Sequence, residues 1–103
     1  MFEKLQQPRD RKTRLLLGFF ELLDAHFPQP LSIAQLARRL HCSPRHLRRT
    51  CRQILGCTPK ECLLARRLAE AQALLANPDL DITAIAYRCG FSSPAHFSAR
   101  FKA

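Results

Sequence analysis

The chain has few acidic residues and no long hydrophobic run. Only 8 of its 103 residues are Asp or Glu, against 17 Lys or Arg, for a net charge of +9. Such an excess favours a polyanionic partner. No apolar run approaches the roughly 18 residues that a membrane span needs, and residues 1–14 are too polar for a secretory signal. We therefore expect a cytosolic protein that does not contact a membrane.

Groups for catalysis or metal binding are also scarce. The chain has three glycines and no glycine-rich phosphate loop, and its four histidines have no paired carboxylate, so we expect no enzyme. The five cysteines form no C-x-x-C pair, and we expect reduced core residues without a metal or cofactor. A zinc site from His41, Cys57 and Cys62, or a thiol redox sensor, stays open as an alternative.

Helical periodicity and cap signals run from residue 10 to the end, and no stretch alternates like a strand. We expect an all-α protein of about six helices, the longest from 59 to 76. Leu64, Leu68, Ala71 and Leu75 form the apolar stripe of that helix. At 1.5 Å per residue, it spans roughly 27 Å.

One segment of the chain occurs twice. LSIAQLARRL at 31–40 recurs as LDITAIAYRC at 80–89, and SPRHL at 43–47 recurs as SPAHF at 93–97. The offset is 49 residues in the first part and 50 in the second, so the turn of the second copy has one extra residue. Each copy predicts two short helices joined by a tight turn, the helix-turn-helix pattern. Two such units in one basic chain predict a protein that holds DNA in two places.

The repeat also predicts how the chain is divided. We expect four parts: a tail at 1–9, a first helix-turn-helix subdomain at 10–57, a linker helix at 58–77 and a second subdomain at 78–103. The first copy continues into another helix, whereas the second stops at the end of the chain, so a final helix is missing. Without it, we expect Phe97 and Phe101 to be partly exposed or to be covered by the first helices.

The second helix of the first copy has a basic outer face. With Leu47 at the centre of the inner face, a rotation of 100° per residue also turns Cys51 and Ile54 inward. The outward and flanking residues are Arg45, His46, Arg48, Arg49 and Arg52. An arginine can bind O6 and N7 of guanine with two parallel hydrogen bonds, which discriminates by about 1–3 kcal/mol. A plain solvated face is the alternative, and the repeated helix-turn-helix context favours DNA.

The second helix of the second copy has a different surface. With Phe97 and Phe101 inward, its outward and flanking residues are Ala95, His96, Ser98, Ala99, Arg100 and Lys102. Alanine can touch a thymine methyl group, and serine and histidine can make single hydrogen bonds. We therefore predict an asymmetric reader, in which the first unit supplies most base specificity and the second mainly anchors the protein and sets register.

Phosphate contacts are expected from polar residues at the starts and sides of these helices. The expected set is Ser43, His46, Arg52, Ser93, Arg100, Lys102, Arg38 and Arg88. Structural alternatives stay open for several of them. Ser43 and Ser93 are also predicted N-caps. His46 and His96 can each have a local packing role instead. Arg38 and Arg88 can simply be solvated.

These motifs resemble the DNA-binding domain of AraC/XylS transcriptional regulators. The resemblance covers about 31–102, and its most specific piece is ITAIAYRCGFSSPAHFS at 82–98, supported by LGCTP at 55–59 and RRLAEA at 66–71. It implies two helix-turn-helix subdomains joined by a long helix, which read successive major grooves of double-stranded DNA in the bacterial nucleoid. The base-contacting positions that it implies are Arg45, Arg48, Arg49, Ala95, His96, Ser98 and Ala99.

The resemblance also carries expectations about the wider protein. It implies a transcriptional activator that touches RNA polymerase, and most members have a separate effector-sensing or dimerisation domain. The chain is thus either a fragment or one of the small stand-alone members. It departs from the family in having Ala99 where arginine is frequent and in lacking a further Gly-x-x-Pro segment with its helix. A non-specific nucleoid or RNA-binding protein is the competing class, and it would discriminate little between DNA sequences.

Overall fold

The computed structural model describes residues 10–102, and within this range the protein is all-α, as predicted. The tail expected at 1–9 lies outside the described residues. The helices are α2 (Arg11–His26), α3 (Ile33–Arg39), α4 (Pro44–Leu55), α5 (Pro59–Leu74), α6 (Ile82–Arg88) and α7 (Pro94–Lys102). None of these helices is long and apolar enough to cross a membrane.

Side-chain caps begin the helices where the sequence predicts them. Ser32 Oγ accepts a hydrogen bond from the Gln35 N–H at 3.1 Å, and the Gln35 side chain accepts one from the Ser32 N–H at 3.0 Å, which completes a capping box. Thr58 Oγ1 caps α5 by accepting from the Glu61 N–H at 3.1 Å, and it donates to Glu61 Oε1 at 3.0 Å. Pro59 occupies the first position of α5, where a missing N–H costs nothing. Local sequence therefore determines where these helices start.

The two helix-turn-helix turns share one backbone geometry. His41 in the first turn has a φ of 58°, and Gly90 in the second has a φ of 91°. In each turn, the next N–H donates at 3.0 Å to the carbonyl oxygen of a buried alanine in the preceding helix: Cys42 to Ala37, and Phe91 to Ala86. Because His41 and Gly90 align at the offset of 49 residues, the extra residue of the second copy is Ser92.

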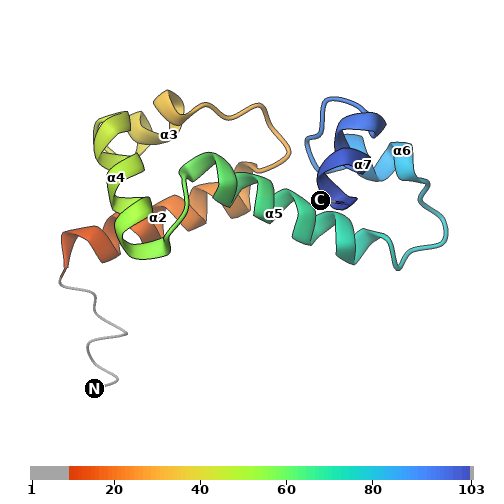
Figure 1. Cartoon of the computed structure of the whole chain (residues 1–103), viewed down its shortest axis with the longest axis horizontal. Helices are drawn as coiled ribbons and strands as arrows, with labels where there is room; N and C mark the ends of the chain where they lie inside the picture. Colours follow the sequence, from red (N-terminus) through yellow and green to blue (C-terminus); the bar gives the residue numbers. More distant parts are fainter. Residues whose placement is uncertain (1–9, 103) are drawn as a thin grey trace, which may run out of the picture.

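Two buried clusters lie at the two ends of the molecule. The first combines α2, α3, α4 and the start of α5, with Phe19, Leu36, Leu47, Cys51 and Leu63 among its members. The second combines α6 and α7 with the later part of α5, and contains Ala71, Ile85, Ala86, Cys89, Phe91 and Phe97. Figure 1 shows α3 and α4 at one end, α6 and α7 at the other, and α5 running between them. The long axis is 44 Å.

Three expectations about helix ends were wrong. The linker helix α5 ends at Leu74 and has 16 residues, the same number as α2, so it is not the longest helix. Leu75, expected on the inner stripe, is its C-cap and is 38% exposed. Ile54, expected to point inward, is 49% exposed. Both side chains lie at the end of a helix, and neither packs against one of the two buried clusters.

The expectation that Phe97 and Phe101 are partly exposed or covered by the first helices is confirmed for Phe101 and wrong for Phe97, which packs in the second buried cluster. Phe97 is buried, whereas Phe101 is 42% exposed. The two rings lie 5.3 Å apart between centroids, so Phe101 covers part of Phe97 and leaves its own outer face open.

Candidate DNA-binding surface

The outer face of α4 carries most of the charge of the first unit. Leu47, Thr50 and Cys51 are buried beneath it, while the residues expected to face outward are all exposed: Arg45, His46, Arg48, Arg49 and Arg52. No hydrogen bond or ion pair with another residue in the range 10–102 involves the four guanidinium groups. Their positive charge and donors are therefore available to a partner.

The second helix of each unit, α4 or α7, begins at a serine cap. The Oγ atom of Ser43 accepts a hydrogen bond from the His46 N–H at 3.0 Å, and Ser93 accepts one from the His96 N–H at 3.0 Å. The capping role predicted for both serines is thus present. Unpaired N–H groups and the positive end of the helix dipole at such a terminus favour an anion. Helix α4 (Pro44–Leu55) has 12 residues, whose peptide dipoles add up at this end.

The outer face of α7 has little charge. Ala95 and Ala99 are exposed and Ser98 is half-buried. Lys102 is the last residue of the helix, but its side chain lies outside the described residues. This surface offers small and apolar groups at the positions where α4 presents arginines.

His96 is held by its own unit. Its Nδ1 atom lies 3.2 Å from Ser92 Oγ, and its ring meets the Phe91 ring edge-on, with 5.5 Å between centroids. Ser92 is the residue added to the second copy, so the insertion supplies this partner. The local packing role that the sequence left open for His96 is present in the structure.

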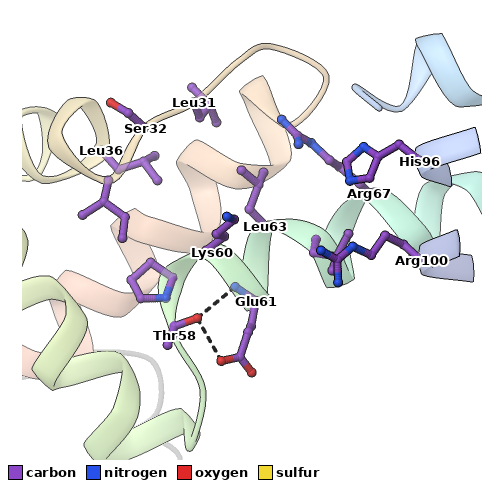
Figure 2. A pocket seen from close by; sticks show the side chains of 13 residues that line it. Leu31, Ser32, Leu36, Thr58, Lys60, Glu61, Leu63, Arg67, His96 and Arg100 are labelled. Carbon is purple, nitrogen blue, oxygen red and sulfur yellow. Dashed lines mark hydrogen bonds between the residues drawn. The ribbon is translucent and has the colours of Figure 1, made fainter. Parts of the chain in front are cut away.

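A cleft of about 530 Å³ separates the two units. Figure 2 shows His96 and Arg100 reaching from α7 over α5, opposite Leu31 and the start of α3. Lys60, on the first turn of α5, lines the same cleft. The sequence did not indicate Lys60 as a candidate, because the candidates came from the two copies of the repeat and Lys60 lies between them, on the linker helix.

Arg67 joins the linker helix to the segment before α3. Its Nε atom donates to the carbonyl oxygen of Phe27 at 2.8 Å, and its Nη2 atom donates to that of Gln29 at 2.8 Å. Burial lowers its pKa, although an arginine stays protonated in proteins. The neighbouring Arg66 is paired with Asp24 at 2.8 Å and stacks over the Phe27 ring at 4.3 Å. No local pattern predicts these contacts, because the partners lie about 40 residues away along the chain.

Two of the predicted phosphate contacts lie on the first helices of the two units. Arg38 on α3 and Arg88 on α6 are exposed, in agreement with either a phosphate contact or solvation.

Among the described residues there is no group of three or more His, Cys, Asp or Glu side chains that could hold a metal ion. The zinc alternative therefore has no ligand set in this part of the chain, although Cys57 and Cys62 do lie side by side.

Two helix-turn-helix units on one linker helix, with a basic recognition helix in the first, define the class: a double helix-turn-helix DNA-binding domain. Residues 36–103 match the family described as "Helix-turn-helix domain". The crystal structure of a transcriptional regulator of the AraC-type DNA-binding class from Chromobacterium violaceum superposes with a TM-score of 0.83 at 34% identity, over 87% of this chain and 80% of that one. The chain belongs to the AraC-type family of DNA-binding domains, a family of transcriptional regulators and not of enzymes.

Other relatives agree with this assignment. The DNA-binding domain of the global transcriptional factor AdpA, solved in complex with a target DNA, has a TM-score of 0.77 at 31% identity, over 85% of this chain and 78% of that one. The transcriptional activator RhaS of Escherichia coli O139:H28 is 39% identical over 100 residues, which are 97% of this chain and 34% of RhaS. The transcriptional regulator GlxA of Rhizobium meliloti is 41% identical over 87 residues, which are 84% of this chain and 27% of GlxA. The chain spans about a third of the length of these curated relatives.

Proposed function

We propose that the chain binds double-stranded DNA in a sequence-specific manner, with α4 and α7 in successive major grooves. The observation that carries this proposal is the set of four exposed arginines of α4, which have no partner within the described residues. The major groove admits an α-helix, and paired helix-turn-helix units use grooves about 34 Å apart. The related AdpA domain, which was solved in complex with a target DNA, supports DNA as the partner.

The first unit is the main base reader in this proposal. Arg45, Arg48 and Arg49 lie near the start and middle of α4, where recognition helices contact base edges. Their planar guanidinium groups match the O6 and N7 acceptors of guanine. We therefore expect guanines to be strongly preferred in the half-site under α4.

The second unit reads bases weakly and anchors the complex. Ala95 and Ala99 can contact thymine methyl groups, and Ser98 can make one hydrogen bond. His96 already has the Ser92 and Phe91 contacts, so it reaches a base only at the cost of rearranging them. The half-site under α7 should accordingly show weak preferences.

Phosphate contacts position the two helices. The proposed set is Ser43, His46, Arg52, Ser93, Arg100, Lys102, Arg38 and Arg88, to which the structure adds Lys60 as a cleft-lining candidate. Because such contacts release condensed counterions, binding should weaken steeply as salt is raised. Arg100 and Lys60 would act between the two half-sites, where the cleft opens.

The proposal extends to the wider protein. The subdomain boundaries are 10–57, 58–77 and 78–103, and the whole protein is a bacterial regulator that acts in the cytoplasm. We propose an activator that contacts RNA polymerase, since the related RhaS proteins are described as transcriptional activators. The chain spans about a third of such relatives, which leaves room for an effector or dimerisation domain elsewhere in the protein.

Selection of bound duplexes from a random library, at one fixed salt concentration, tests the proposal. The expected result is a motif of about two helical turns, with guanines strongly fixed in one half and weak preferences in the other. An equally informative motif in both halves would overturn the asymmetry. Retention of duplexes without any enriched motif would overturn specific binding and favour a generic basic binder.

A further inference from the structure

Two cysteine thiols are adjacent at the junction between α4 and α5. The Sγ atoms of Cys57 and Cys62 lie 2.9 Å apart. A disulfide bond is about 2.05 Å long, so the two sulfur atoms need to approach by only about 0.9 Å to be bonded. Neither cysteine belongs to the proposed DNA-binding surface.

The backbone around this pair fixes its geometry. Gly56 ends α4 with a φ of 74°, and the buried Pro59 begins α5 after its Thr58 cap. Gly56 thus turns the chain just before Cys57, and Thr58 and Pro59 start α5 between the two cysteines. Cys62 packs against the first buried cluster, and both thiols are half-buried, so a small reagent can reach the pair while the fold stays closed.

We propose that Cys57 and Cys62 form a redox-reactive dithiol, which a hydroperoxide converts into an intramolecular disulfide. The Cys57 thiolate attacks the peroxide oxygen and becomes a sulfenic acid, while hydrogen peroxide loses its other oxygen as water once a proton is taken up. The Cys62 sulfur then displaces the sulfenic oxygen as a second water, and the S–S bond forms. In total, two thiols lose two electrons and one peroxide gains them.

The two cysteines have different roles in this reaction. Burial, the hydrogen bond to Cys57 and neighbouring charge raise the pKa of Cys62, so we assign Cys62 as the resolving thiol. Because the reactive species is the thiolate, Cys57 is the first nucleophile. Burial also raises the pKa of Cys51, to about 11, and Cys89 is fully buried, so these two thiols should stay reduced.

The bond would join the end of the first recognition helix to the linker helix. It closes a short loop around residues 57–62, which contributes less through chain entropy than a long loop does, and it leaves the exposed face of α4 unchanged. The expected product is therefore a folded domain with a covalent cross-link at the α4–α5 junction, and not an unfolded or aggregated one.

Trypsin provides a direct assay on the full chain. It cuts after Arg52, Lys60 and Arg66 and thus separates Cys51, Cys57 and Cys62 onto three peptides. After treatment of the native protein with hydrogen peroxide, we expect loss of two hydrogens in the intact mass and a cross-linked peptide pair 53–60/61–66. The count of free thiols should fall from the five cysteines to three, and dithiothreitol should restore it.

Variants assign the roles of the two thiols. Cys62→Ser should stop at the Cys57 sulfenic acid, trapped with dimedone, whereas Cys57→Ser should leave Cys62 unmodified. Cys42→Ser is the matched control and should form the 57–62 bond normally; circular dichroism checks that each variant is folded. Five free thiols after peroxide, a cross-link to another cysteine, or an intermolecular disulfide in its place would each overturn the proposal. None of these readouts involves DNA, so they stand or fall independently of the proposed function.

Discussion

Gly90 lies directly against Arg67. A Cβ atom at position 90 would stand 2.9 Å from Nε of Arg67 and 2.9 Å from the carbonyl oxygen of Phe27, which is itself the acceptor of the Arg67 Nε–H. The turn of the second unit, the linker helix and the segment before α3 therefore meet at one point. This contact joins the two helix-turn-helix units directly, in addition to the shared α5.

Replacement of this glycine should therefore destabilise the protein through two effects. Gly90→Ala introduces an L side chain at a φ of 91° and forces it against Arg67 and two carbonyl oxygens. We expect a loss of about 2–4 kcal/mol in the free energy of unfolding, as strain and a disturbed buried hydrogen bond add. Gly56→Ala is the matched control, because its φ is 74° but its Cβ would have nothing within 4 Å; it should lose only about 1 kcal/mol. Equal losses in urea unfolding would contradict the contact.

Arg67 should be sensitive even to a conservative change. Arg67→Lys keeps the positive charge but cannot donate from two fixed nitrogens to the carbonyl oxygens of Phe27 and Gln29. We expect a loss of about 1–2 kcal/mol, the cost of weakening one part-buried and one exposed charge-assisted hydrogen bond. Arg88→Lys, at an exposed position, should change stability by less than about 0.5 kcal/mol. The comparison is made by thermal and urea unfolding, and equal effects at the two positions would count against the role of Arg67.

The first turn contains a site where a stabilising substitution is expected. His41 has a φ of 58°, a conformation that costs a side-chain residue about 1–2 kcal/mol and that glycine adopts freely. His41→Gly should therefore raise the free energy of unfolding by about 0.5–1 kcal/mol, after the entropy that glycine adds to the unfolded chain. His46→Gly, inside α4, should instead lower it by about 1 kcal/mol. A lower midpoint of unfolding for His41→Gly would contradict this account.

The second recognition helix should gain specificity from one substitution. Ala99 is exposed on α7, so Ala99→Arg places a guanidinium group at the position that corresponds to Arg49 of α4. We expect selection to fix a guanine in the half-site under α7, with a discrimination of about 1–3 kcal/mol. Ala69→Arg, exposed on the linker helix, adds the same charge away from the recognition face and should raise affinity without changing the motif. Identical motifs for both variants would place α7 outside the groove.

The sequence predicted the elements well because their causes are local. Each helix start depends on a cap residue and its near neighbours, as at Ser32 and Thr58, and the repeat identifies both turns. The contacts of Arg67 and Gly90 could not be predicted in this way, because they join segments that are distant along the chain. The prediction that Ile54 is buried was wrong for a related reason. Helical periodicity gives the direction of a side chain but not how far the core extends.

The same limit applies to the candidate site. The arginines of α4 were predicted as exposed from one buried residue, Leu47, and the helical rotation, and they are exposed. His96 occupies the position matching His46, but the inserted Ser92 and the ring of Phe91 hold it. An alignment of the two copies does not show that difference, because it arises from a partner that only one copy has.

Base reading by α4 is tested by a comparison of two variants. Arg49→Ala and Arg52→Ala are measured on the duplex selected by the unaltered chain and on a scrambled duplex, across a salt series. For Arg49→Ala, the account predicts that the preference for the selected duplex falls about tenfold or more. For Arg52→Ala, it predicts equal weakening on both duplexes and a salt slope smaller by about one. Loss of affinity by the same factor on both duplexes for Arg49→Ala would contradict base reading by this helix.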